Sequence, residues 1–334
     1  MTAAGTEAAE YGDLFRARLE HIVAVHEPLV LVSQIHRSGG TLLSQLFDGH
    51  PQCHAHPHEL AIGYPKSRHW PQLDLGAPTR WFDLLDEHYP EKHFREGYRK
   101  PAQKPGDGEA DVFPFLFPPR LQRAIFDRCV EEWQPKTERD VLDAYFTSYF
   151  NAWLDNENLY ATPKKVVTGF APRVNMKPAN IERFFAAYPD GKLVSMVREP
   201  RAWYASARTQ KDSHAAVGEA LRRWTLSAEA TLAEKEQHGD RVVVLTYEQL
   251  VRDTEGTMEQ LAERLGLPMS PVLLEPTFNG RPIRANSSAP VGSYGVLSDR
   301  TEAYRDALDE ETIARVDELA GDLYLRVVER SLGR

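Results

Sequence analysis

Cysteine is scarce in this 334-residue sequence, which contains only Cys53 and Cys129. Two thiols cannot form the disulfide framework of a small secreted domain, so we expect both to be free and the protein to be cytoplasmic. Long apolar runs are also missing, since none approaches the about 18 residues that a membrane-spanning helix needs. Residues 1–10 lack the basic and apolar regions of a secretory signal. The sequence therefore predicts a protein that does not span a membrane.

Positive charge is the second shortage. The chain has 40 Lys and Arg against 49 Asp and Glu, a formal net charge of −9. This balance argues against a general nucleic-acid-binding protein, because such proteins neutralise phosphates with a basic surface. An anionic ligand would therefore have to be held by a few local arginines.

The lysine of the nucleotide-binding P-loop is absent as well. The segment 36–41, HRSGGT, joins an apolar strand-like run, 28–32, to a helix-like segment, 42–47. In the pattern G-x-x-x-x-G-K-[ST], Gly40 would occupy the position of the lysine. A strand that turns through small residues into a helix still presents free N–H groups and the positive end of the helix dipole. The junction predicts a phosphate or sulfate site, with an ordinary turn and helix N-cap as the alternative.

A cation is nevertheless present in this junction, at Arg37. Its planar guanidinium could hold two oxygens of an anion at once. A second arginine follows a second strand: the run 193–197 leads into Arg198, and Ser206 lies further along on the expected helix. We therefore expect two anion-binding motifs, each at the carboxyl end of a strand.

Together with the segment 245–250, LTYEQL, these motifs resemble those of the sulfotransferases that use 3′-phosphoadenosine 5′-phosphosulfate (PAPS). The first motif is similar to the family's Arg/Lys-Ser-Gly-Thr-Thr loop for the 5′-phosphosulfate, with Gly40 in place of the first Thr. Arg198 and Ser206 match the family's pair for the 3′-phosphate, and Tyr247 matches a tyrosine that lies near the adenine. The resemblance covers roughly residues 28–60 and 165–300.

The family also places a basic, glycine-containing loop around the 3′-phosphate and the adenosine. Arg284 could serve in such a loop, although the segment 284–288, RANSS, could equally form a simple turn. The resemblance thus implies that PAPS is bound by Arg37, Ser38, Gly39, Gly40, Thr41, Leu42, Arg198, Ser206, Tyr247 and Arg284.

Alternating strand and helix signals predict an α/β fold built on a parallel sheet. The resemblance adds a P-loop-like, three-layer architecture, in which ligands collect at the carboxyl ends of the strands. We expect strands at 28–34, 165–170, 192–197 and 241–246, and helices at 42–47, 178–188, 248–265 and 308–332.

A single sulfotransferase domain would then span residues 1–334, with 28–60 and 165–334 as its PAPS-binding core. The stretch 61–164 is rich in Trp, Tyr, Phe and Pro, and the polar part 100–111 lies inside it. We interpret it as a partly helical, aromatic-rich insert that binds the acceptor, and the alternative is that its aromatic residues form the plain core of a helical subdomain.

A hydroxyl acceptor must lose its proton during sulfuryl transfer, so a carboxylate or histidine has to lie within reach. Cytosolic phenol and steroid sulfotransferases use the histidine of a Lys-Thr-His segment, but the comparable segment here, 168–172, is TGFAP. Tyrosylprotein and carbohydrate-type sulfotransferases instead carry a glutamate after a His-Pro turn. This chain has that turn at 50–51, followed by Glu59. We predict Glu59 as the catalytic base, with His58 and His56 as substitutes and a solvated loop carboxylate as the alternative.

The alternation of His54, His56 and His58 would place all three on one side of an extended segment, which is one pattern of a metal site. No HExxH motif or similar companion accompanies them. We therefore favour histidines that lie at the surface or contact the substrate, and we predict no metal ligands.

These observations predict an enzyme that moves the sulfuryl group of PAPS to a hydroxyl, or an amine, of a small-molecule, glycan or lipid acceptor. Arg37 and the loop amides would stabilise the charge on the leaving phosphate, so no metal would be required. Three alternatives stay open: a kinase or NTPase of the same architecture, a non-catalytic nucleotide-binding or scaffold protein, and a metal hydrolase built on the histidines. The sequence does not identify the acceptor, and it is compatible with a homo-oligomer.

Overall fold

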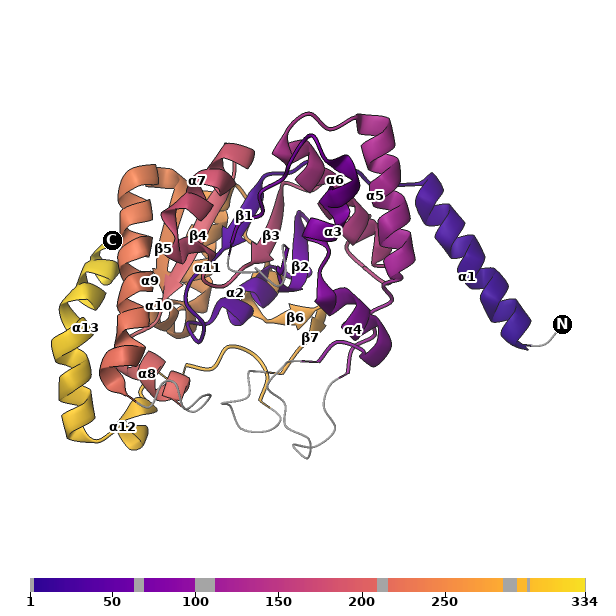
Figure 1. Ribbon diagram of the computed structural model, residues 1–334. Coiled ribbons are helices and arrows are strands. Elements are labelled where there is room, and N and C mark those ends of the chain that lie inside the picture. Colours follow the sequence, from indigo (N-terminus) through magenta and orange to yellow (C-terminus); the bar gives the residue numbers. More distant parts are fainter. Residues whose placement is uncertain are drawn as a thin grey trace.

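A five-stranded parallel sheet forms the centre of the computed structural model (Figure 1). The structure describes residues 3–62, 69–99, 112–208, 216–284, 293–298 and 301–333. The strands lie in the order β2-β3-β1-β4-β5, and neighbouring strands of this sheet run parallel. Their carboxyl ends therefore meet at one edge, where ligands of such sheets bind. The strands are β1 (Leu29–Val32), β2 (Cys53–Glu59), β3 (Val166–Phe170), β4 (Lys192–Val197) and β5 (Val242–Thr246).

Helices cover both faces of the sheet, which confirms the predicted three-layer α/β architecture. Alternate residues of β1 enter two separate apolar cores, Leu29 and Leu31 on one side and Val30 and Val32 on the other. One core contains α2 (Gly40–Phe47), α10 (Tyr247–Arg252) and α11 (Thr254–Leu265). The other contains α5 (Pro119–Trp133), α6 (Glu138–Ala152), α7 (Pro178–Ala187), α8 (Pro200–Arg208), α9 (Val217–His238) and α13 (Glu310–Arg330).

The predicted insert supplies α3 (Trp81–Leu85), α4 (His88–Glu96), α5 and α6, which lie to the right of the sheet in Figure 1. Most of its large aromatic side chains are buried, among them Trp70, Phe117, Tyr145 and Tyr149. These residues form core rather than an open pocket wall. The segment 100–111 lies outside the described residues. The remaining elements are α1 (Ala3–Glu20), α12 (Tyr304–Ala307), β6 (Thr277–Phe278), β7 (Arg281–Pro282) and short 3-10 turns at Pro78–Arg80, Val174–Met176, Gly239–Arg241 and Pro271–Leu274.

The four predicted strands are confirmed, but the single helix predicted over 248–265 is wrong. The chain forms α10 and α11 instead, separated at Asp253. Asp253 leaves the helical conformation at φ −137°, and its carboxylate accepts a hydrogen bond from Gly256 N at 3.0 Å. A carboxylate in this position caps the start of a new helix. The helix predicted at 308–332 corresponds to α13, which α12 precedes.

Strand β2 was not among the predicted strands, because its sequence, CHAHPHE, contains three histidines and a proline. It lies at the edge of the sheet and pairs only with β3 within it. Pro57 is tolerated there because an edge strand has one side free of ladder hydrogen bonds. The pairing shifts register between Ala55 and Glu59, so the end of this strand departs from a regular ladder.

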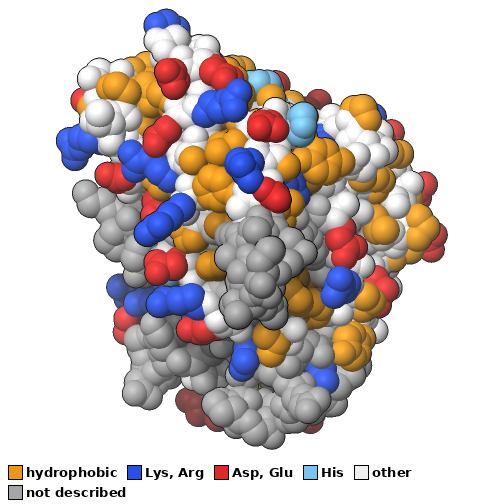
Figure 2. Space-filling view, turned by 90° about the vertical axis from the view of Figure 1, so that its right-hand side faces the viewer, with side chains coloured by type: hydrophobic (Ala, Val, Ile, Leu, Met, Phe, Trp, Pro, Cys, Tyr) orange, Lys and Arg blue, Asp and Glu red, His pale blue; other side chains and the backbone are white. Residues whose placement is uncertain are grey.

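The charged side chains are mixed in sign on the face that Figure 2 shows, where acidic and basic groups are interspersed. No described helix is both long enough and apolar enough to cross a membrane. Cys53 and Cys129 are buried and unpaired, which confirms that the thiols are free.

Candidate active site

The loop between β1 and α2 folds as a tight turn that depends on Gly39. This residue has a left-handed backbone with φ 89°, and α2 begins directly after it. A Cβ atom at Gly39 would lie 2.6 Å from the ring of Tyr247 and 2.8 Å from Met196 Cε. Only glycine therefore fits between the loop, the end of β4 and the start of α10 (Tyr247–Arg252).

Gly40, which stands in place of the first threonine of the loop that the sequence resembles, is required for a different reason. A Cβ atom there would overlap the ring of Phe170 on β3 and the side-chain amide of Gln34. With its amide oxygen turned toward the loop, Gln34 accepts from Gly40 N at 3.2 Å. Phe170 and Gln34 thus take up the space that a larger residue would need.

Replacing Gly40 by alanine should lower the free energy of unfolding by ~1–3 kcal/mol, because overpacking forces the neighbouring groups to move. Chemical denaturation of the variant measures this loss. The matched control is Gly218→Ala on α9, where no atom lies within 4 Å of the added Cβ, and we expect no loss there. Equal stabilities of the two variants would show that Phe170 and Gln34 do not constrain the loop.

The two anion motifs predicted from the sequence come together in the structure. Arg37 Nε donates to Ser206 Oγ at 3.0 Å, and Arg198 Nη1 donates to the Arg37 carbonyl at 3.1 Å. Burial and the neighbouring charge of Arg198 lower the pKa of Arg37. Two guanidinium groups held side by side repel each other, so this arrangement favours an anion between or beside them.

Two buried polar atoms of these motifs have no hydrogen-bond partner, namely Ser38 Oγ and Arg198 Nε. Buried donors normally have partners, and those without one are commonly found where a ligand binds. Together with the Gly39 turn, these donors fit the oxygens of a phosphosulfate or phosphate group.

A carboxylate network holds the backbone that carries Arg198. Glu248 Oε2 accepts from Glu199 N at 3.1 Å and from the Tyr324 hydroxyl at 2.9 Å. Burial raises the pKa of Glu248. Arg201, in contrast, lies 2.6 Å from Glu199 and 3.5 Å from Asp317, so its charge is already paired.

Tyr247 and Arg284 complete the set of predicted donor residues. Arg198 lies over the ring of Tyr247, 4.6 Å from its centroid. Arg284 pairs with Tyr294 in an isolated antiparallel bridge and lies over its ring at 6.0 Å. The predicted loop residues 285–288 and Gly292 lie outside the described residues. The roles of Tyr247 and Arg284 toward the donor stay predictions.

Glu59 lies at the carboxyl end of β2, where it is paired with Phe170 on β3. The ring of Phe170 borders Gly40, so a single residue connects the donor loop with Glu59. Burial raises the pKa of Glu59, and the nearby positive charge of Arg173 opposes this rise. Arg173 N donates in turn to the carbonyl of Gln34 at 2.9 Å. Glu59 is therefore a partly buried carboxyl group beside the loop, and not a solvated loop carboxylate.

Sequence reasoning missed Arg173. Its backbone is left-handed at φ 67°, as is that of Arg37 at φ 68°. Non-glycine residues in this conformation are uncommon and cluster at functional sites. The sequence signal for this residue is its position directly after the segment 168–172, TGFAP, where the histidine of the cytosolic sulfotransferases is absent.

Of the two expectations for His54, His56 and His58, the position at the surface is wrong, because all three are buried. Contact with the substrate stays a prediction. The three histidines share the face of β2 that packs against the insert, where His54 lies against Phe150 and His56 against Tyr149. His56 and His58 contact Glu87, and their ligand atoms lie within 4.8 Å of one another.

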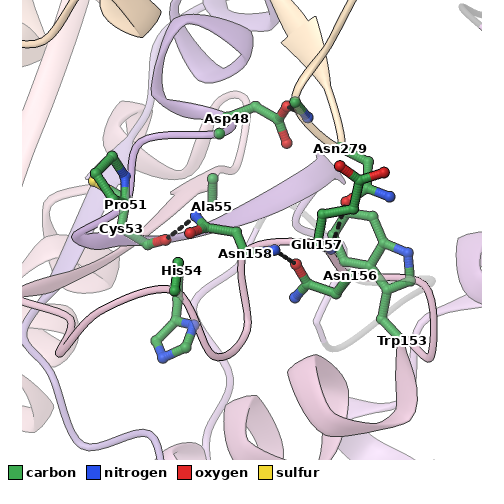
Figure 3. Close-up of a pocket in the computed structure, with 13 residues that line it drawn as sticks. Asp48, Pro51, Cys53, His54, Ala55, Trp153, Asn156, Glu157, Asn158 and Asn279 are labelled. Carbon is green, nitrogen blue, oxygen red and sulfur yellow. Dashed lines mark hydrogen bonds between the residues drawn. The ribbon is translucent and has the colours of Figure 1, made fainter.

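A cavity of about 220 Å³ opens at the other end of β2 (Figure 3). Asp48, His54, Trp153 and Asn158 are among the residues that line it, and Asn158 Nδ2 donates to the Cys53 carbonyl at 3.0 Å. Ala55, the lining residue of β2 nearest to Glu59 in sequence, precedes it by four positions, about 13 Å at ~3.3 Å per residue. Glu59, Arg37 and Arg198 are not among the residues that line this cavity.

The architecture and the loop define a P-loop-like α/β protein. A sequence model of the sulfotransferase family matches residues 28–271, well over half of the chain, so the protein belongs to the sulfotransferase family. This confirms the predicted enzyme class and sulfuryl transfer as its reaction. No match was found among curated proteins.

Solved structures of sulfotransferases align with most of the chain at low sequence identity. A sulfotransferase domain from the curacin biosynthetic pathway is 16% identical, with 88% of this chain and 98% of that chain covered and a TM-score of 0.47. A sulfotransferase domain from the Synechococcus PCC 7002 olefin synthase is 18% identical, with 89% of this chain and 96% of that chain covered and a TM-score of 0.46. A mouse sulfotransferase complexed with 3′,5′-bisphosphoadenosine (PAP) is 12% identical, with 96% of this chain and 90% of that chain covered and a TM-score of 0.37. The family assignment is based on the sequence match alone.

Proposed function

We propose that this sulfotransferase moves the sulfuryl group of PAPS to a hydroxyl of a small-molecule, glycan or lipid acceptor, with Glu59 as the base. The observation that carries the proposal is the chain of contacts around Phe170. This residue borders Gly40 in the donor loop and pairs with Glu59, so the anion site and the carboxyl group lie at the same sheet edge.

Each donor residue receives a role from its place in this site. Arg37 and the N–H groups of Ser38, Gly39, Gly40 and Thr41 would hold the 5′-phosphosulfate, at the start of α2 where Leu42 follows. Arg198 and Ser206 would bind the 3′-phosphate, which ATP and AMP lack. Tyr247 would lie beside the adenine, and Arg284 would close the nucleotide site.

The transfer itself needs few protein groups. Glu59 would take the proton of the acceptor hydroxyl while the acceptor oxygen forms its bond to sulfur. The bond between sulfur and the bridging oxygen breaks, and that oxygen leaves with the bisphosphate. Arg37 and the loop amides would stabilise the charge that develops there. Arg173, beside both Glu59 and Gln34, would favour the ionised form of Glu59.

The reaction should run without a divalent metal. PAPS labelled with ³⁵S is incubated with the protein and a panel of acceptors comprising a phenol, a primary alcohol, a sugar and an amine, with and without EDTA. We expect label on a hydroxyl acceptor in both conditions, since the positive groups that neutralise the leaving phosphate come from the protein. Loss of transfer in EDTA, restored by Mg²⁺, would contradict this and favour a metal-dependent reaction.

The same assay separates the alternatives. A kinase of this architecture would transfer the γ-phosphoryl group of labelled ATP in the presence of Mg²⁺. A non-catalytic binding protein would bind PAP and transfer label to none of the acceptors.

A further inference from the structure

A buried polar cluster lies where β2 packs against the insert, and the reaction proposed above does not use it. Glu87, between α3 and α4, is only 3% exposed and contacts both β2 and α6. Its Oε1 lies 3.0 Å from His56 Nε2 and accepts from the Tyr145 hydroxyl at 2.8 Å, and its Oε2 accepts from Ala61 N at 2.7 Å. Such a cluster is costly to bury unless each polar atom is paired.

The hydrogen atoms of this cluster can be counted. His56 Nδ1 lies 3.0 Å from the His58 carbonyl, and a carbonyl oxygen only accepts, so His56 Nδ1 carries a hydrogen. The 3.0 Å contact between His56 Nε2 and Glu87 Oε1 needs a second hydrogen, because two lone pairs would repel there. The His56–Glu87 pair therefore holds one proton more than a neutral imidazole and a carboxylate would share.

That proton belongs on His56. Two donors that do not depend on this proton, the Tyr145 hydroxyl and Ala61 N, also reach the Glu87 oxygens, which stabilises the ionised carboxylate. His56 and Glu87 thus form a buried, charge-balanced pair.

His58, in contrast to His56, is a neutral imidazole with its hydrogen on Nδ1. Its Nδ1 donates to the Glu59 carbonyl at 2.9 Å, and its Nε2 lies 2.8 Å from the Tyr149 hydroxyl, which donates to it. Burial and the nearby His56 lower the pKa of His58 well below its usual range. The neighbouring His88 and His93 of α4 act in the same direction.

These bonds enclose the backbone of Glu59 on both sides. His56 holds the carbonyl of residue 58, His58 holds the carbonyl of Glu59 itself, and Glu87 holds the amide of Ala61. The same stretch contains the register shift of the β2–β3 pairing, where a regular ladder no longer determines the backbone. Something other than the sheet must therefore define where the Glu59 side chain points.

We propose that Glu87, paired with a doubly protonated His56, is a positioning residue that holds the end of β2 and so directs the Glu59 carboxylate toward the acceptor. This inference rests on the proposed role of Glu59 as the base. The alternative is that the cluster binds a metal ion, because one nitrogen or oxygen atom from each of His56, His58 and Glu87 lies within 4.8 Å of the others. A bound cation would displace the hydrogens that are counted above.

The charge state is tested on the full chain without any acceptor. The protein is labelled with ¹⁵N-histidine, and the ring nitrogens are observed by NMR at pH 7.5. We expect one imidazole with hydrogens on both nitrogens, whose signal disappears in His56→Gln and changes to that of a neutral ring in Glu87→Gln. A neutral His56 in the wild-type protein would overturn the inference, as would one equivalent of metal found by elemental analysis of the purified protein.

The positioning role is tested by turnover with whichever hydroxyl acceptor the ³⁵S assay identifies. Glu87→Ala should lower kcat by ~10²-fold with PAP affinity unchanged, because a shift of about 1 Å in a reacting group has an effect of that size. Glu87→Gln should recover most of kcat, since an amide can still accept from Ala61 N and donate to a neutral His56. The matched control is Asp86→Asn, the same chemical change at the exposed neighbouring residue, which should retain wild-type kcat.

The outcomes distinguish this inference from the proposed function. Wild-type kcat in a folded Glu87→Ala variant, together with an inactive Glu59→Gln variant, would overturn the positioning role and leave the base in place. An active Glu59→Gln variant would remove the base assignment, and with it the positioning role, whatever the NMR shows. If Glu87→Ala does not fold, Tyr145→Phe takes its place, because it removes the hydroxyl that donates to Glu87 Oε1. A kcat of Tyr145→Phe equal to that of Asp86→Asn would contradict the inference.

Discussion

Replacing Glu59 by glutamine should lower turnover by ~10²–10⁴-fold, because the amide keeps the size of the side chain but cannot accept the proton of the acceptor hydroxyl. PAP binding should barely change, since the role proposed for Glu59 is toward the acceptor and not toward the donor. Steady-state kinetics with the labelled donor measures the first effect and calorimetry the second. Glu96→Gln, at the exposed end of α4, is the matched control and should behave like the wild type.

The histidine variants His58→Ala and His56→Ala belong in the same series. If Glu59→Gln keeps more than about a tenth of wild-type turnover while a histidine variant does not, the base is a histidine. The structure favours the carboxylate, because both histidines are buried and both ring nitrogens of each contact other protein groups.

The pH dependence gives an independent check on Glu59. Burial raises the pKa of this carboxyl group, and the base works only when it is ionised. Turnover should therefore fall as the pH is lowered through that raised pKa. Arg173 opposes the rise, so Arg173→Ala should move the acidic limb of the pH profile to higher pH. A shift to lower pH would show that Arg173 does not act on the base.

The second large effect concerns the donor. PAP should raise the melting temperature far more than 5′-AMP does, because a ligand that binds only the folded state stabilises it by mass action. Arg198→Ala should remove this difference, since a hydrogen bond to a charged group contributes ~1.5–3 kcal/mol. Differential scanning fluorimetry measures both.

Arg201→Ala is the matched control for that experiment. It removes a guanidinium group from the same segment, but one that is already paired with Glu199 and Asp317. The difference between PAP and 5′-AMP should survive in this variant. Equal shifts with the two nucleotides in the wild-type protein would contradict the assignment of Arg198 and Ser206 to the 3′-phosphate.

The sequence by itself determined four of the five strands of the sheet, the two anion motifs and the family. Apolar runs that end in small or basic residues predict parallel strands with ligands at their carboxyl ends, and these signals are local. The strands β1, β3, β4 and β5 were predicted for this reason. So was the helix that follows the Gly39 and Gly40 turn.

Only the tertiary structure decided what surrounds Glu59. Strand β2 carries three histidines and a proline, a composition that is read locally as a loop, and it becomes a strand only because β3 pairs with it. Burial of the histidines depends on the insert helices, and the partners of His56 come from Glu87, which lies 31 residues away in sequence. Arg173 donates to the Gln34 carbonyl and its charge acts on Glu59, and both residues are distant along the chain. Such contacts leave no periodic signal in the sequence, because they are formed by packing between elements and not within them.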